Sequence, residues 1–192
     1  MKVKLSFDRI KIILIASILL LIFLAWTISS QIKLPISSWN YHGTNLKFRI
    51  NLRDVEKIEI YPSENAIKKE ILNNFVENIT IIFKPGDEII NAHYAVEVFE
   101  ITYKLTVAYK LNLAYIPNFN VINVTSYENL KGTRENPIIA LVHPIYSNET
   151  SVKLDNHVIY IQGKGARSPA EQLRNFDLAV AKFLMAVLDI KL

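Results

Sequence analysis

An apolar run from Ile12 to Ile32 contains no charged residue and sets the first limit on what this chain can be. An apolar helix of about twenty residues spans the roughly 30 Å hydrocarbon core of a membrane. Trp26 lies near the far end of the run, where an amphipathic aromatic side chain suits the membrane interface. The run therefore predicts a transmembrane helix over 12–32.

The charges on either side of this run indicate its orientation. Residues 1–11 carry four positive side chains, whereas only Lys33 follows the run closely before Lys47. Such a Lys/Arg excess marks the cytoplasmic side of a membrane segment. We therefore expect a single-pass protein of the cell membrane, with residues 1–11 in the cytoplasm and the remainder outside it.

Two other interpretations of the run are weaker. A cleaved signal peptide has an apolar region of about 7–15 residues and a small-x-small cleavage site. This run is longer, and Thr27-Ile28-Ser29 matches such a site poorly. A buried core helix is disfavoured because the stretch is so long and so uniformly apolar. A retained anchor is the favoured interpretation, with cleavage as the open alternative.

The charge and the composition exclude several classes of function. The chain has a formal net charge of +4, and residues 1–11 supply +3 of it, so residues 12–192 carry the remaining +1. Binding to nucleic acid needs a concentrated basic face, which this balance does not indicate. The chain has no Cys, which excludes disulfides, thiolate metal sites, a Cys nucleophile and a lipidated-Cys anchor. No cofactor is predicted.

The first half of the remaining chain combines strand and helix patterns. Residues 33–45 mix Pro, Ser, Gly and Asn with aromatics and predict a linker. Residues 46–52 and 57–61 alternate apolar and polar side chains, as half-buried strands do. Ser63 is a candidate N-cap for a helix in which Ile67, Ile71 and Phe75 share one face. The apolar run 79–83 predicts a buried strand.

The stretch 89–111 fits two periods. Its odd-numbered residues after Ile101 are apolar and alternate with polar ones, which is typical of a strand. At helical period, His93, Glu97, Glu100 and Lys104 instead form one polar stripe. A strand of more than twenty residues would be abnormal, so the prediction is a helix. The polar stripe is interpreted as the solvated face of that helix, although His93 and Glu97 could together hold a proton or a metal ion.

The second half predicts more strands and a final helix. Residues 119–124 and 138–142 are strand candidates, and 151–154 and 157–161 form a hairpin around Asp155-Asn156 in which Leu154 is paired with His157. Ser168-Pro169-Ala170-Glu171 has the pattern of a capping box, followed by an apolar helical face to about Leu188. The fold class is thus an α/β domain over 46–192, with a mixed sheet in two or three layers.

Two candidate sites follow from side-chain chemistry. His143, His157 and Glu149 could ligate zinc and leave one position open for water, although no known ligand spacing is present. The loop that contains Gly163 and Gly165 leads into the capped helix, so Lys164, Arg167 and Ser168 form a candidate anion-binding site. The alternative for each is an ordinary surface or boundary position.

Three Asn-x-Ser/Thr patterns occur, at Asn78, Asn123 and Asn148. The first two overlap predicted strands, so only Asn148 is a reasonable acceptor for a carbohydrate.

These observations favour a binding or accessory subunit of the cell envelope, anchored in the membrane and in contact with another membrane or envelope protein. The alternative is a membrane-anchored hydrolase that is metal-assisted or acts on a phosphorylated envelope substrate. A pilin-like subunit is disfavoured, because Pro35 and the neighbouring serines would end the N-terminal helix soon after the membrane.

Overall fold

The computed structural model describes residues 37–192. The predicted cytoplasmic segment 1–11, the transmembrane helix 12–32 and the first residues of the predicted linker lie outside this range. Within residues 37–192, no helix is both long enough and apolar enough to cross a membrane.

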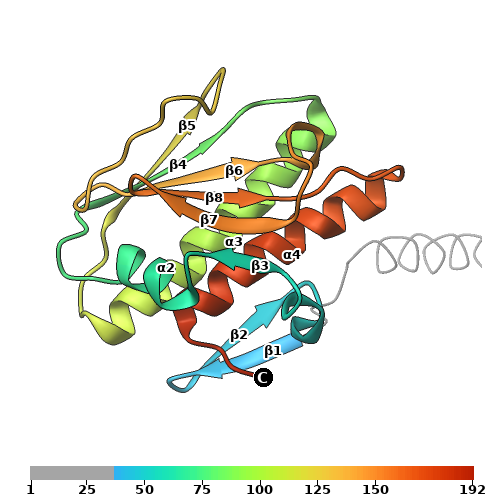
Figure 1. The fold of residues 1–192 in the computed structure, drawn as a ribbon. Helices are drawn as coiled ribbons and strands as arrows, with labels where there is room; N and C mark the ends of the chain where they lie inside the picture. Colours follow the sequence, from blue (N-terminus) through green and yellow to red (C-terminus); the bar gives the residue numbers. More distant parts are fainter. Residues whose placement is uncertain (1–36) are drawn as a thin grey trace, which may run out of the picture. The chain divides into compact units, whose positions relative to one another are not determined.

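The centre of the domain is a six-stranded mixed sheet (Figure 1). Its strands, in spatial order, are β3 (Glu59–Tyr61), β7 (Ser151–Asp155), β8 (Val158–Gln162), β6 (Ile138–Val142), β4 (Asn78–Phe83) and β5 (Asn118–Asn123). The strands β8, β6, β4 and β5 run parallel to one another, whereas β7 is antiparallel to β8. The predicted α/β class with a mixed sheet is therefore confirmed.

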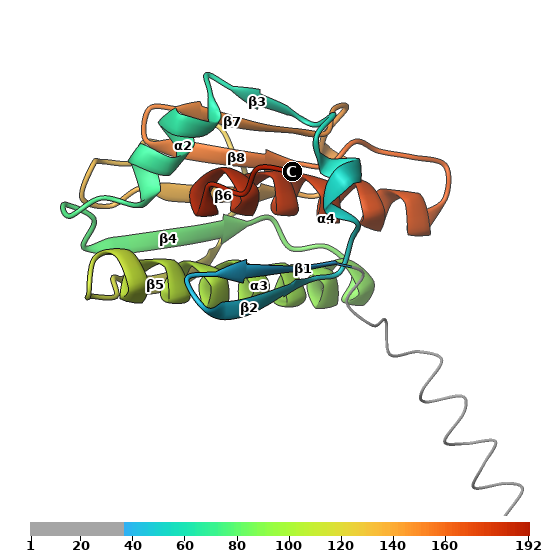
Figure 2. The same cartoon turned by 90° about the horizontal axis from the view of Figure 1, so that it is seen from below.

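In the described part of the chain, three α-helices accompany this sheet: α2 (Glu64–Ile71), α3 (Glu88–Asn112) and α4 (Pro169–Leu188). The two long helices lie on one face of the sheet (Figure 2). The main core lies between this face and the helices. A smaller cluster on the opposite face packs Ile82, Ala140 and Val158 against residues of the loop that follows β5. The sheet and its helices thus form two layers, with a loop as the only cover of the second face within 37–192.

The helix prediction for 89–111 is confirmed, since α3 spans Glu88–Asn112. Asp87 caps it by accepting a hydrogen bond from the backbone N–H of Ile90 at 2.9 Å. The helix connects β4 to its parallel neighbour β5, and such a parallel pair needs a crossover. The apparent strand alternation after Ile101 is therefore incidental to a long helix that packs on both sides.

The C-terminal helix also begins as predicted. The Ser168 hydroxyl accepts a hydrogen bond from the Glu171 N–H at 3.2 Å, and Pro169 occupies the first turn. Every residue of α4 from Leu178 to Leu188 is buried. This helix lies between the sheet, α2 and α3, which explains why its apolar residues surround the whole helix rather than form one stripe.

The linker prediction is wrong for residues 37–45. This segment contains β1 (Ser37–Tyr41) and the start of β2 (Thr44–Phe48), which form a separate antiparallel hairpin. The turn residues His42 and Gly43 both have positive φ, as a two-residue primed turn requires. The predicted strand 46–52 ends early, because β2 stops at Phe48 and a short 3-10 helix, η1 (Leu52–Val55), begins at Leu52.

The predicted register of the second hairpin is also wrong. Leu154 pairs with Ile159 rather than with His157, and Asp155 pairs with Val158. The turn is Asn156-His157, and both residues have positive φ. Asp155 thus belongs to the strand, and the whole pairing shifts by two residues. A smaller correction concerns Phe75, which lies beyond the end of α2 and is exposed.

Candidate functional site

The polar stripe of α3 points into the protein, so its interpretation as a solvated face is wrong. Glu97 is fully buried, and His93 and Lys104 are almost so. Charged side chains are found inside proteins only where partners compensate them. The partners here come from the residue after β2 and from α4, two segments far from α3 in the sequence.

Arg49 is the first of these partners. Its guanidinium forms a buried ion pair with Glu97, and its Nη2 lies 3.2 Å from Asp177 Oδ1. Its Nε lies 3.5 Å from Glu100 Oε2. Arg49 directly follows β2, Asp177 belongs to α4, and the two glutamates belong to α3. One guanidinium therefore joins three elements of the fold.

His93 forms the second set of contacts. Its Nε2 lies 2.9 Å from Asp177 Oδ1 and 3.3 Å from Glu97 Oε1, so one ring nitrogen faces both carboxylates. Lys104 completes the group, with its Nζ 2.6 Å from Glu100 Oε1 and above the ring of Phe48. We call these six residues the charged cluster, and its members are Arg49, His93, Glu97, Glu100, Lys104 and Asp177.

The charged cluster shifts the pKa of its members. Burial acts to lower the pKa of His93, but hydrogen bonds to Asp177 and Glu97, together with their charges, raise it to about 8. Burial raises the pKa of Glu97 despite its contacts with His93 and Arg49. Burial also opposes ionisation of Asp177, yet its hydrogen bonds and the charge of Arg49 lower its pKa. His93 is thus a cation at neutral pH.

The fully ionised cluster has three anions and three cations, so its formal charge is zero. One nitrogen or oxygen from each of His93, Glu97 and Asp177 lies within 4.8 Å of the others, which is the spacing of a metal-binding set. However, Arg49 Nη2 and His93 Nε2 already contact the same oxygens, Glu97 Oε1 and Asp177 Oδ1. A metal ion would have to displace both cations. The geometry favours a cluster that holds the fold together.

The predicted metal set His143, His157 and Glu149 does not assemble. His143 follows β6, whereas His157 precedes β8, at opposite ends of two paired strands. Six residue steps along the strands, at about 3.3 Å each, separate them by roughly 20 Å. His157 instead contacts Glu70 at 2.8 Å, and Glu149 contacts Lys153 at 2.6 Å. The parallel pairing of β6 and β8, which the sequence did not reveal, causes this separation.

The predicted anion-binding residues lie at the start of α4. Lys164 and Arg167 are exposed, and the Ser168 hydroxyl is the helix cap described above. The Lys164 N–H donates to Thr150 Oγ1 at 3.0 Å, and its carbonyl accepts from Asn175, so the backbone of this loop is held in place. Anion binding there stays a prediction. Asn148 is exposed between η2 (Pro144–Tyr146) and β7, and carbohydrate attachment likewise stays a prediction.

The face of α3 that points away from the core is apolar. Phe99 is 70% exposed and Ile89 is 68% exposed, and Val96 and Tyr103 are also exposed. We call these four side chains the outer face of α3. Phe99 and Tyr103 stack with their ring planes 8° apart and their centroids 6.2 Å apart. Helix α3 thus buries charged side chains beside apolar ones such as Tyr94 and Tyr109, and it exposes the rings of Phe99 and Tyr103, unlike an ordinary surface helix.

A shallow hollow adjoins this outer face. It has a volume of about 280 Å³ and lies between β2 and α3. Phe99 and Tyr103 form its apolar side, and its polar side is formed by Asn45, Lys47, Glu100 and Lys104. The hollow therefore combines an aromatic wall with a polar rim.

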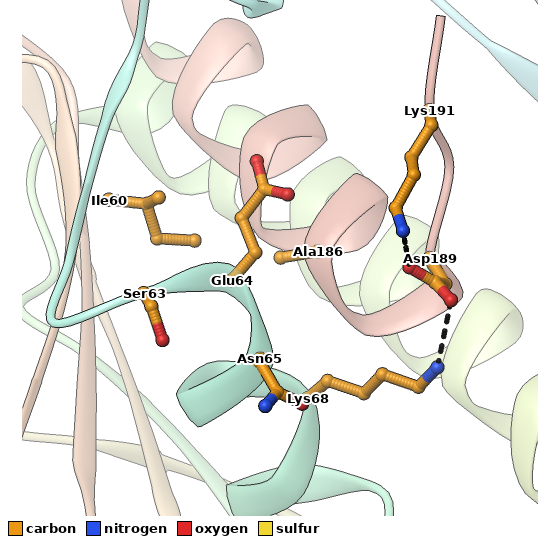
Figure 3. A pocket seen from close by; sticks show the side chains of 8 residues that line it. All are labelled: Ile60, Ser63, Glu64, Asn65, Lys68, Ala186, Asp189 and Lys191. Atoms are coloured by element: carbon orange, nitrogen blue, oxygen red, sulfur yellow. Dashed lines mark hydrogen bonds and ion pairs between the residues drawn. The ribbon is translucent and has the colours of Figure 1, made fainter.

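A second hollow lies between the start of α2 and the end of α4 (Figure 3). Its volume is about 560 Å³, and its walls carry two acids and two lysines. Asp189 contacts Lys68 at 3.3 Å and Lys191 at 3.4 Å, while Glu64 contacts Lys182 at 2.6 Å. Both acids already have cationic partners, so this hollow does not indicate a ligand.

Comparisons of the chain with protein-family models, with curated proteins and with solved structures found no significant match. The functional argument therefore rests on the residues and contacts of this protein alone.

Proposed function

We propose that the protein is a binding or accessory subunit of the cell envelope. A single helix over 12–32 anchors it in the membrane, its domain lies outside the cytoplasm, and the outer face of α3 contacts another membrane or envelope protein. The basic residues before the apolar run support the topology. The observation that supports the proposed protein contact is the exposure of the apolar side chains Phe99 and Ile89.

The outer face of α3 has the composition of a protein interface. A large exposed apolar patch on a folded protein commonly marks a surface that another molecule covers. Interface cores are enriched in Phe and Tyr and depleted in charge, and polar residues surround them. Phe99 and Tyr103 supply such a core, and Asn45 and Lys47 lie at its edge. The stacked rings can insert into a pocket of the partner, and the hollow beside them can receive an anchoring side chain from the partner.

The charges of this surface favour a protein over a lipid headgroup layer. Helices that lie on membrane surfaces carry Lys and Arg along their polar side, which attract anionic lipids. From Glu88 to Tyr103, α3 contains no Lys or Arg, and Glu88 is exposed near Ile89. The exposed charge of this stretch is acidic, which would weaken binding to such a surface although Lys47 lies at its edge. A protein with an apolar patch is the occupant that fits this composition.

Photo-cross-linking in the native membrane tests the proposal. A photoreactive phenylalanine analogue replaces Phe99 in one full-length variant and Tyr61 in a control variant. Tyr61 belongs to β3 and is 67% exposed, which makes it as accessible as Phe99. We expect one dominant protein adduct from position 99, identified by mass spectrometry, that position 61 does not give. Equal adducts from both positions, or only lipid or self adducts from position 99, would contradict the proposal.

Protease treatment of intact cells or spheroplasts tests the topology separately. We expect the domain to be digested while the N-terminal segment stays protected. A domain that resists digestion until the membrane is broken would contradict the extracytoplasmic location.

A further inference from the structure

The edge strand β5 leaves one side of the six-stranded sheet open. The sheet ends at β3 on one side and at β5 on the other, and within residues 37–192 β5 is paired with β4 alone (Figure 1). Five of the six residues of β5 are exposed. An edge strand presents a row of backbone N–H and C=O groups that can pair with another strand. The free side of β5 is therefore a candidate surface for the addition of a strand.

The free backbone groups of β5 belong to its odd-numbered residues. The Asn118 N–H donates to the carbonyl oxygen of Glu77 at 3.0 Å, on the β4 side of the strand. The Val124 N–H likewise donates to Phe83, the last residue of β4, at 2.9 Å. Successive residues of a strand direct their backbone groups to alternate sides. The odd-numbered residues, with Val121 at their centre, thus direct theirs away from β4 and toward the free edge.

The two edges of the sheet differ in their protection. Natural proteins protect an edge strand by keeping it very short, or with charged residues and Pro. The strand β3 has only three residues, begins with Glu59 and is followed by Pro62. In contrast, β5 has six residues and contains neither a charged residue nor Pro. Its apolar residues Val121 and Ile122 are 50% and 49% exposed. The β5 edge thus lacks the features that prevent an edge strand from pairing.

A second copy of the chain fits this edge better than an unrelated peptide. Proteins that bind a peptide at a sheet edge select it through pockets for its side chains. Neither hollow described above includes a residue of β5. In a two-fold antiparallel pair each strand instead meets itself, so the surface must be compatible with its own copy. The strand β5 meets this requirement, because it carries no charge that its copy would repel.

We propose that two copies of the protein pair through β5 about a two-fold axis at Val121, so that their sheets become continuous. The two strands run antiparallel, with Val121 opposite Val121 of the second copy and Phe119 opposite Asn123. This register places all the free odd-numbered residues opposite one another, in the hydrogen-bonded kind of antiparallel pair. It uses no residue of the outer face of α3 or of the adjoining hollow. The dimer therefore goes beyond the proposed envelope contact and is tested independently of it.

Sedimentation equilibrium of the full-length protein in density-matched detergent micelles measures the dimer. We expect a micromolar dissociation constant, because a single strand pair is a small interface. Val121→Lys places like charges opposite each other across the axis and should weaken dimerisation at least about tenfold, and Val121→Glu should do the same. An equal mixture of the two variants should restore dimerisation, since each Lys then meets a Glu. Tyr61→Lys, at an exposed position of β3, is the control and should leave the dimer unchanged.

Single cysteines test the register, because the chain has no cysteine of its own. The two Cα atoms of a hydrogen-bonded antiparallel pair are about 5.5 Å apart, so a short bifunctional thiol reagent should join Val121→Cys into a covalent dimer. Tyr61→Cys should stay monomeric under the same treatment. The proposal is overturned by a monomeric natural protein, by a dimer that persists in Val121→Lys, or by a mixture of the charge variants that stays monomeric. Absent cross-linking at position 121, or equal cross-linking at position 61, would also overturn it.

Discussion

Asp177 Oδ1 lies 2.9 Å from His93 Nε2, and Arg49 Nη2 lies 3.2 Å from the same oxygen. One carboxylate oxygen thus joins the first hairpin, α3 and α4. Because the three segments are distant in the sequence, this contact closes large loops and forms only in the folded domain. The cluster around it is balanced in charge, so the loss of any one member leaves a buried charge without its partner.

Replacement of Arg49 should show this most clearly. In Arg49→Met, the fully buried Glu97 loses one of its two cationic partners, and breaking a buried pair in this way costs about 3–5 kcal/mol of the free energy of unfolding. Urea unfolding of the purified full-length protein, followed by circular dichroism, measures the change. Arg174→Met is the control, because Arg174 pairs with Asp54 on the surface and such pairs contribute about 0–1 kcal/mol. Equal losses in both variants would contradict a stabilising cluster.

The free energy of unfolding of the domain should fall as the pH rises above 6.5, because His93 then loses its proton. Its pKa rises from 6.5 to about 8 on folding, so its stabilising effect is complete below pH 6.5 and disappears as the pH rises through 8. A shift of about 1.5 pKa units corresponds to about 2 kcal/mol. Unfolding is compared for the natural protein and His93→Gln from about pH 6 to about pH 9. The difference between them should shrink by that amount, and a constant difference would refute the assignment.

Gly163 should not tolerate a side chain. A Cβ at this position would lie 2.8 Å from the Cα and 2.9 Å from the backbone nitrogen of Phe176. Because these are backbone atoms of α4, they cannot rotate away, and Gly163→Ala should cost about 1–3 kcal/mol of the free energy of unfolding. Lys164→Ala in the same loop is the control and should change it by less than about 0.5 kcal/mol, because Lys164 is exposed. Thermal unfolding of both variants distinguishes these results.

The outer face of α3 should contribute little to the stability of the isolated protein. Phe99→Ser should change the free energy of unfolding by no more than about 0.5 kcal/mol, since its ring is mostly in solvent. Phe183→Ser, in the buried part of α4, should cost more than about 3 kcal/mol. Phe99→Ser should also reduce co-purification of the partner protein from native membranes. A strongly destabilised Phe99→Ser protein would show that this ring supports the fold instead.

Much of the secondary structure could be predicted from neighbouring residues. Ser63 and Ser168 cap their helices as expected, because a hydroxyl and an N–H three residues away interact locally. The length of the 89–111 stretch was enough to favour a helix over a strand. The hairpin turn was harder to place, since Asp155-Asn156 and Asn156-His157 are both plausible turn pairs, and pairing across the strands selects the second.

The charged cluster was missed for a different reason. Arg49 alternates with Phe48 and Ile50, as an outward-facing strand residue does, and nothing near it in the sequence reveals its partners. Asp177 gave a usable signal, since an acid between Phe176 and Leu178 on an otherwise apolar helix needs a buried cation. The zinc hypothesis placed His143 and His157 together because they flank adjacent strand candidates, without knowledge of the parallel pairing of β6 and β8.

The chain therefore specifies its elements through short-range forces: helix caps, turn geometry, and the periods of apolar residues that hydrogen bonding imposes. These forces act over a few residues, so they can be read along the sequence. Which side of α3 is buried depends on contacts across 48 residues to Arg49 and 84 residues to Asp177. Such contacts exist only after the hairpin and α4 have packed, because burial strengthens charge pairing that water would screen. Tertiary packing alone thus turns the charged side chains of the polar stripe inward and leaves the rings of Phe99 and Tyr103 in solvent.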